Sequence, residues 1–311
     1  MLKIKDGIIG HAIGDAMGVP FEFRDRQELF KNPVTDMVGY GTYSVPAGSW
    51  SDDTSMEIAT IDSFIEKGSF KCENIMEKFS NWINQGDYTP YGKVFGVGRT
   101  CVQAIRRYEQ GFNIDECGLN DFNSNGNGSL MRILPVAYYC YYRKLNYREM
   151  YKLVKDVSSL THGHEISILG YYIYVNFVVE LLDTGNKFLA YSKTKNIDYS
   201  LFSQKALKMY SRILQSDIGK LEIDDIKSSG YVVDTLEASL WSLLKTENYK
   251  DAVITAVNLG NDTDTIGAIT GSLAGILYGY DNIPNEWSNK LVRRDYLEKL
   301  CNDFEITLTN N

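Results

Sequence analysis

The chain has 311 residues, which is long enough to bury a sizeable core and could form one large domain or two ordinary ones. Its content of 44% hydrophobic and 23% charged residues is ordinary for a soluble globular protein. The net charge of −8 argues against nucleic acid or an anionic membrane as the main partner. A phosphate ester would have to be bound locally, by backbone N–H groups, a few arginines or a metal ion.

The five cysteines are scattered, and no two form a Cys-x-x-Cys pair. This pattern favours a reducing cytoplasm and argues against a disulfide framework or a zinc site. Residues 1–7 lack the apolar core and cleavage site of a signal peptide, so we expect a cytoplasmic protein. The longest apolar stretch, residues 166–182, contains three tyrosines, an asparagine and a glutamate, which predicts a buried core helix and no membrane span.

Helical periodicity dominates the chain, beginning with Ile4, Ile8 and Ala12, and no convincing alternating strand pattern occurs. The predicted fold class is all-α, with a single multi-helix domain over residues 1–311. A more polar, less periodic peripheral insertion with one helix is expected at about 185–230. Further helical runs are predicted at residues 75–83, 102–108, 130–142, 150–160, 166–182, 202–214, 232–244, 252–259 and 266–278.

Two of the predicted helices carry stripes of glycine. They are found at positions 7, 10, 14 and 18 of the first helix and at positions 267, 271 and 275 of the last. Glycine costs about 1 kcal/mol per helix-interior position relative to alanine, so such a stripe is expected where another backbone approaches closely. Membrane dimer helices use the same spacing, but Asp262 and Asp264 at the start of this run and Ser272 inside it argue against a membrane helix.

Two short acidic clusters, residues 51–54 (Ser-Asp-Asp-Thr) and 262–265 (Asp-Thr-Asp-Thr), lie far apart in the chain, and each opens an apolar helical run. Either cluster alone could be a helix cap. However, one cap needs one side-chain acceptor, and each cluster contains three or four. Since Mg²⁺ and Mn²⁺ prefer oxygen ligands gathered from separate segments, we interpret the clusters as two halves of one metal site.

A further carboxylate, Glu22, lies between Phe21 and Phe23. It could be a surface residue whose aromatic neighbours point inward. Alternatively, it could be a desolvated carboxylate at the rim of a site, with its pKa tuned for proton transfer or for orienting water. Asp15, near the end of the first helix, should be mildly unfavourable there because a carboxylate opposes the helix dipole.

Residues 125–129 (Asn-Gly-Asn-Gly-Ser) precede a predicted helix and could bind an anion, since glycines let the backbone approach and helix-start N–H groups favour negative charge. The same residues also mark ordinary turns. Of the three histidines, His11 is expected in the core, while His162 and His164 lie at a junction between helices. No further His or clustered Cys completes a zinc site, so we favour a ligand-contacting role for the His162 segment.

Together these motifs resemble the ADP-ribosylglycohydrolase family, in particular the bacterial enzymes related to dinitrogenase reductase-activating glycohydrolase. They occur in the family's order from about residue 7 to residue 280. The matching stretches are residues 14–18 (Gly-Asp-Ala-Met-Gly) with Glu22, residues 51–54, 126–132 (Gly-Asn-Gly-Ser-Leu-Met-Arg), 161–164 (Thr-His-Gly-His), 230–238 (Gly-Tyr-Val-Val-Asp-Thr-Leu-Glu-Ala) and 262–265.

The resemblance implies an all-α orthogonal bundle with a binuclear centre of two Mg²⁺ (or Mn²⁺) ions. Glu22 matches an acidic residue that contacts a metal or its water, and Glu22, Asp52 and Asp264 are the candidate catalytic residues. The implied metal ligands are Ser51, Asp52, Asp53, Asp262, Asp264 and Thr265, with Ser51 standing where many members have Thr. The implied substrate-binding residues are Gly126, Asn127, Gly128 and Ser129 for a diphosphate, His162 near the ADP-ribose, and Tyr231, Gly96 and Gly98.

The implied substrate is an ADP-ribosylated protein or a small ADP-ribose conjugate. Related bacterial enzymes often have Phe-Asp-Ile-Gly where residues 95–98 here are Phe-Gly-Val-Gly, so a carboxylate that could face an arginine guanidinium is missing. Arginine is the favoured leaving group, with serine or another group still open. Two alternatives remain: a metal-dependent phosphohydrolase of a nucleotide pyrophosphate, and a non-catalytic ADP-ribose-binding relative.

Overall fold

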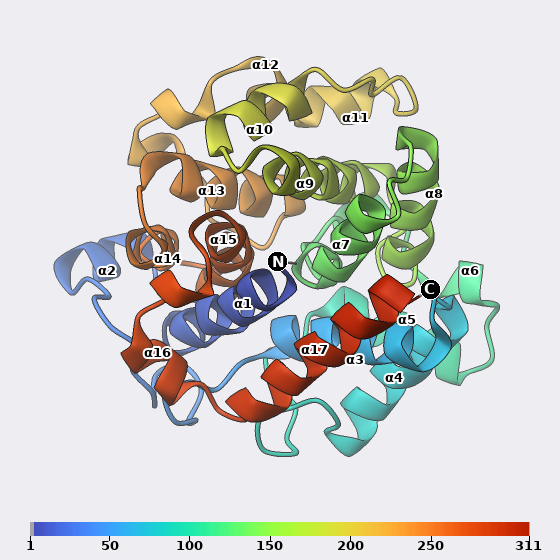
Figure 1. The fold of residues 1–311 in the computed structure, drawn as a ribbon, viewed down its shortest axis with the longest axis horizontal. Coiled ribbons are helices and arrows are strands. Elements are labelled where there is room, and N and C mark those ends of the chain that lie inside the picture. The colour runs from blue at the N-terminus through green and yellow to red at the C-terminus, as the bar shows by residue number, and fades with distance from the viewer. Residues whose placement is uncertain (1–2, 311) are drawn as a thin grey trace.

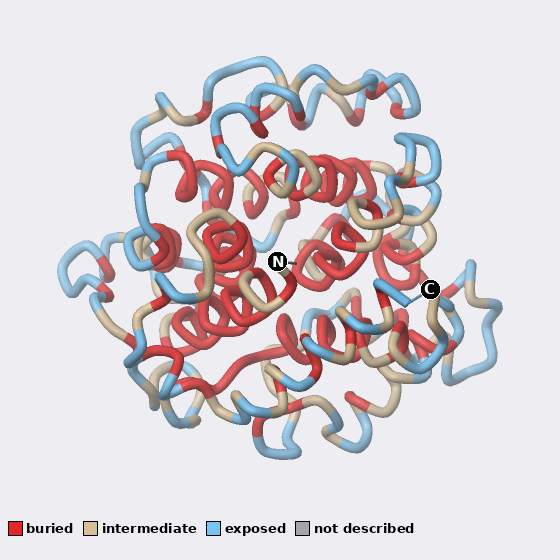
Figure 2. The backbone as a smooth tube through the Cα atoms, in the orientation of Figure 1, coloured by how far each residue is buried: buried red, intermediate tan, exposed pale blue. Residues whose placement is uncertain are grey.

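The computed structural model describes residues 3–310, and Met1 and Leu2, which open the segment analysed for a signal peptide, lie outside that range. Within it the chain is helical, as predicted, and its only β-type pairings are two isolated bridges, Leu119 with His162 and Gly126 with Tyr231. The helices cross in several directions around a shared interior (Figure 1). Buried residues gather on the inner helices, and exposed residues lie on the outer loops and helix faces (Figure 2).

The α-helices occur in chain order as follows: α1 (Ile4–Gly18), α2 (Arg26–Lys31), α3 (Asp52–Lys67), α4 (Cys72–Gln85), α5 (Arg99–Glu109), α6 (Ile114–Cys117), α7 (Leu134–Tyr142), α8 (Tyr147–Ser158), α9 (Glu165–Thr184), α10 (Lys187–Lys195), α11 (Gln204–Met209), α12 (Ser211–Gln215), α13 (Val232–Lys245), α14 (Tyr249–Val257), α15 (Thr263–Tyr278), α16 (Asn285–Lys290) and α17 (Arg294–Asn310).

Two of the predicted helices are broken in the structure. The run predicted at 130–142 contains a 3₁₀ turn at Leu130–Arg132, and α7 begins only at Leu134. The reason is Pro135 in the first turn of α7, which has no backbone N–H to donate to the preceding turn and is tolerated at the start of a helix. The run predicted at 202–214 is divided into α11 and α12 at Tyr210.

The segment predicted as an insertion with one helix contains three short α-helices and two 3₁₀ turns. The α-helices are α10, α11 and α12, and they lie along the upper edge of the molecule in Figure 1. Helix α9 is long and apolar enough to cross a membrane, but 78% of its apolar window is buried within the fold. It packs against α7, α8 and α10, which agrees with the predicted core helix.

Helices α1 and α15 pack against each other in antiparallel orientation through their glycines. A Cβ added at Gly14 would lie 2.0 Å from the Gly267 carbonyl oxygen, and one added at Gly271 would lie 2.3 Å from the Gly10 carbonyl oxygen. The close backbone approach predicted from the stripes is therefore confirmed. At the end of α1, a Cβ on Gly18 would lie 2.4 Å from the Asp264 Cα, so this contact runs directly into the second acidic cluster.

Replacement of Gly14 by alanine tests this packing. The new Cβ would meet backbone atoms that cannot move aside, so we expect Gly14→Ala to lower the free energy of unfolding by roughly 2 kcal/mol or more, despite the better helix propensity of alanine. Gly98→Ala is the control, because a Cβ there has nothing within 4 Å and φ is −67°. Denaturant unfolding measures both, and equal stability of the two variants would contradict the packing described.

Candidate functional site

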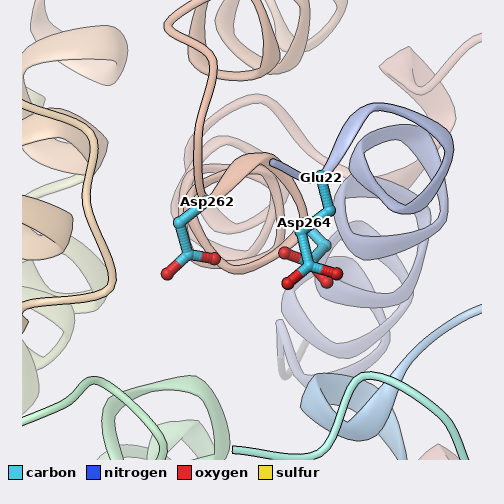
Figure 3. A group of neighbouring side chains, drawn as sticks. All are labelled: Glu22, Asp262 and Asp264. Atoms are coloured by element: carbon cyan, nitrogen blue, oxygen red, sulfur yellow. The ribbon is translucent and has the colours of Figure 1, made fainter. Parts of the chain in front are cut away.

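Glu22, Asp262 and Asp264 come together where the end of α1 meets the start of α15. One carboxylate oxygen of each lies within 4.8 Å of those of the other two. Glu22 follows the 3₁₀ turn Val19–Phe21 that continues α1, Asp262 occupies the N-cap position of α15, and Asp264 lies in its first turn. In Figure 3 the carboxylates of Glu22 and Asp264 lie side by side, with that of Asp262 next to them.

The first acidic cluster faces the same cleft, which has a volume of about 280 Å³. Asp52 and Asp53, in the first turn of α3, line this cleft together with Glu22, Asp262 and Asp264. Thr265 lines it as well. Ser51 does not line the cleft; it is buried at the N-cap of α3, where its hydroxyl donates to Asp53 Oδ2 at 3.0 Å. Two clusters that are distant in the chain thus share one site.

Asp15 holds the N-terminus of α3 in place. Its carboxylate accepts hydrogen bonds from the Ser51 N–H at 3.0 Å, the Thr54 N–H at 3.1 Å and the Thr54 hydroxyl at 2.6 Å. The penalty expected for Asp15 at the end of α1 is therefore offset by the N-terminus of a second helix. Because Asp15 and Ser51 supply the capping acceptors, Asp52 and Asp53 keep oxygens that face the cleft.

The carboxylates of this cleft lack basic partners. Within residues 3–310, no lysine or arginine forms a salt bridge with Glu22, Asp52, Asp53, Asp262 or Asp264. Burial, reinforced by neighbouring carboxylates, raises the pKa of Asp264 well above its usual range. Burial also raises the pKa of Glu22 to about 7. Among the described residues, Glu22 Oε2 and Asp53 Oδ1 have no hydrogen-bond partner, although both atoms are buried.

The loop at residues 125–129 is attached directly to the acidic cluster. The Asn127 side-chain amide donates to Asp262 Oδ2 at 2.6 Å and to the Thr235 hydroxyl at 2.9 Å, and Gly126, Asn127 and Gly128 line the cleft. The expectation that an α-helix starts directly after this loop is wrong, because only a 3₁₀ turn follows. The loop itself therefore offers an anion backbone N–H groups, and the segment directly after it does not add the N-terminus of an α-helix.

The other predicted contact residues differ in their placement. His162, Gly96 and Gly98 line the cleft, whereas Ser129 and Tyr231 do not. Ser129, the last residue of the loop, is fully buried, and Tyr231 precedes α13 and pairs through its backbone with Gly126. The second histidine of the pair, His164, caps α9 by accepting from the Ile166 N–H at 3.2 Å. His11 is buried, as expected.

Gly96 lies against the acidic cluster. Its φ is +79°, and a Cβ there would lie 2.8 Å from Asp52 Oδ1. The position at which related bacterial enzymes often have Asp therefore lies at the edge of the cleft, beside the carboxylate of Asp52.

Some residues of the cleft were not selected from the sequence. Phe23 is the most distinctive, because its side chain is 73% exposed and its φ is +68°, which is rare for a residue with a side chain. In the sequence, only its position next to Glu22 indicated that Phe23 could belong to the site. The others are Val97, Arg99, Thr100, Cys101, Met131 and Gly230.

Comparison with known proteins shows the family of this chain. The model of the family described as ADP-ribosylglycohydrolase matches residues 2–310. This chain belongs to the ADP-ribosylglycohydrolase family. The family and the all-α fold predicted from the sequence are thereby confirmed, and the chain is a glycosidic-bond hydrolase.

Several relatives match over most of their length. An ADP-ribosylarginine hydrolase, Tri1, of Serratia proteamaculans is 33% identical over 302 residues, covering 96% of this chain and 78% of the relative. A glycohydrolase of ADP-ribosylated dinitrogen reductase from Rhodospirillum rubrum is 30% identical, covering 91% and 88%. A solved ADP-ribosylglycohydrolase-related protein complex has a TM-score of 0.83 at 25% identity, covering 99% of this chain and 98% of its own.

Because the cleft brings like charges together, removing one of its carboxylates should stabilise the fold, whereas most substitutions destabilise it. In buffer without divalent cations, Asp264→Asn should raise the free energy of unfolding by roughly 1 kcal/mol, because it removes a buried carboxylate from among others and leaves an amide oxygen to accept from the Thr265 N–H. Exposed Asp87→Asn should change stability little. A clear loss of stability in Asp264→Asn under these conditions would contradict the electrostatic account.

Proposed function

We propose that this chain hydrolyses the glycosidic bond between ADP-ribose and a modified protein side chain, with arginine as the favoured linkage and a binuclear Mg²⁺ or Mn²⁺ centre. The observation that carries the proposal is the convergence of Glu22, Asp262 and Asp264 within 4.8 Å in a cleft shared with Asp52 and Asp53. The arginine linkage is supported by relatives named ADP-ribosylarginine hydrolase, at 33% and 31% identity.

The donor set fits hard divalent cations. It offers carboxylate oxygens from two helix starts, with the Thr265 hydroxyl in the same cleft and the Ser51 hydroxyl behind it. The unpartnered oxygens of Glu22 and Asp53 are the kind of buried group that a cation would satisfy. The proposed ligands remain Ser51, Asp52, Asp53, Asp262, Asp264 and Thr265. When bound, the ions would supply Lewis-acid polarisation and a template for substrate oxygens and water.

Glu22 is the proposed base, or the residue that orients the attacking water. Burial raises the pKa of Glu22 to about 7 in the metal-free protein, and bound cations would lower it, so that Glu22 would be an ionised carboxylate able to accept a proton. Cleavage of the glycosidic bond builds positive, oxocarbenium-like charge at the anomeric carbon. The negative field of Asp52 and Asp264 would stabilise that charge, which gives these residues an electrostatic role next to the proton transfer by Glu22.

The diphosphate is proposed to bind at residues 126–128. Gly126 and Gly128 let a ligand approach the backbone, and Asn127 links the loop to Asp262 through a hydrogen bond. A substrate bound at this loop would therefore be connected through Asn127 to Asp262, a proposed metal ligand. Ser129 and Tyr231 would act through the loop backbone, because neither side chain lines the cleft.

Recognition of an arginine-linked substrate needs a carboxylate that pairs with the guanidinium of the modified arginine. With glycine at position 96, the nearest carboxylate to that edge of the cleft is Asp52, whose Oδ1 would be 2.8 Å from a Cβ at position 96. We propose that Asp52 takes this role. A guanidinium entering past Gly96 could pair with it directly.

Release of ADP-ribose from arginine-linked and serine-linked peptides, run side by side with Mg²⁺, Mn²⁺ or a chelator, tests the proposal. We expect metal-dependent cleavage of the arginine-linked peptide and weaker or no cleavage of the serine-linked one. Activity that is unchanged in chelator would reject the metal centre. Formation of AMP and ribose phosphate would indicate the phosphohydrolase alternative.

Glu22→Gln and Asp264→Asn should each lower kcat by at least about a hundredfold, since each removes a proposed proton-transfer or charge-stabilising group. The matched control is Glu73→Gln, which changes an exposed glutamate in the first turn of α4. Near-normal turnover of either cleft variant would overturn its assigned role.

A further inference from the structure

Arg132 is fully buried in the protein behind the cleft. Its guanidinium lies over the Phe79 ring, 4.7 Å from the ring centroid, and Nη2 donates to the Thr161 hydroxyl at 2.9 Å. Nε and Nη1 have no hydrogen-bond partner within residues 3–310, and no carboxylate there pairs with them. Burying an uncompensated charge is costly, so a role beyond packing is expected for this side chain.

The Thr161 hydroxyl lies between Arg132 and His162, at 2.8 Å from His162 Nδ1. A guanidinium has only donors, so the Thr161 oxygen must accept from Arg132. Its single proton is then available for Nδ1, which is a stronger acceptor than the sulfur of neighbouring Cys101. This arrangement favours Nδ1 as the acceptor, which in the neutral ring puts the proton on Nε2.

The Nε2 edge of His162 faces the glycine loop. A Cβ added at Gly126 would lie 3.4 Å from Nε2, and one added at Gly128 would lie 3.5 Å from it. No residue between 3 and 310 hydrogen-bonds with Nε2, and His162 lines the cleft. Its Nε2–H is thus a free donor at the site proposed for the ADP-ribose.

We propose that Arg132 and Thr161 are positioning residues that hold His162 in its Nε2–H tautomer, so that it donates a hydrogen bond to a substrate oxygen bound at the Gly126 to Gly128 loop. The nature of the ligand rests on the proposed function, whereas the tautomer does not. Burial and the charge of Arg132 lower the pKa of His162 to about 3, which keeps the ring neutral at physiological pH.

The tautomer can be observed directly. The chain has only three histidines, so ¹⁵N-histidine labelling gives a simple NMR spectrum in which His162→Gln assigns the His162 signals. We expect Nε2 of His162 to be the protonated nitrogen and Nδ1 the unprotonated one in the wild-type protein. A proton on Nδ1 would overturn the proposal, and this result needs no further variant to fold.

Thr161→Val and Thr161→Ser separate positioning from packing. Valine keeps the volume and loses the hydroxyl, so we expect loss of the single tautomer and roughly three- to tenfold weaker binding of ADP-ribose by calorimetry. Serine keeps the hydroxyl and should restore both properties. A valine variant with wild-type tautomer and affinity would contradict the proposal. The expected tautomer without any ADP-ribose binding would overturn the ligand assignment and the proposed function, and leave the positioning role of Arg132 and Thr161 standing.

Discussion

The site depends on the backbone contact between α1 and α15. Gly14 and Gly267, and Gly10 and Gly271, lie so close that no side chain fits between the two helices. The last of these contacts, at Gly18, brings the end of α1 against Asp264, and Glu22 follows only a few residues later. The close packing therefore does more than fill the core: it sets the distance between carboxylates that are far apart in the chain.

A second constraint comes from Asp15, which belongs to α1 but caps α3. Helix α1 thus determines where both acidic clusters lie. Its glycines pack against the start of α15, which carries residues 262–265, and its Asp15 binds the start of α3, which carries residues 51–54. The same hydrogen bonds leave Asp52 and Asp53 without capping duties, and within residues 3–310 neither of them forms a salt bridge with a lysine or an arginine. Like-charge repulsion and burial of carboxylates at this one place lower the stability of the fold. Such a local loss of stability is typical of a functional site.

Much of this could be predicted from the chain alone. The glycine stripes and the surplus acceptors of residues 51–54 and 262–265 are local patterns with few structural explanations, and the family resemblance put them in one site. Helix α17 was missed although its buried residues Leu297, Leu300 and Phe304 have helical spacing. The role of Asp15 could not be predicted, because it depends on which helix start lies beside it. The positive φ of Phe23 and the relay from Arg132 through Thr161 to His162 are likewise products of tertiary contacts.

The central claim is that these converging carboxylates form a site for two divalent cations. Calorimetric titration of the metal-free protein with Mn²⁺, in the wild type and in Asp264→Asn, tests it most directly. The account predicts binding of two ions by the wild type and loss or marked weakening of binding in the variant. Absence of Mn²⁺ and Mg²⁺ binding to the folded wild-type protein, or equal binding by the variant, would contradict it.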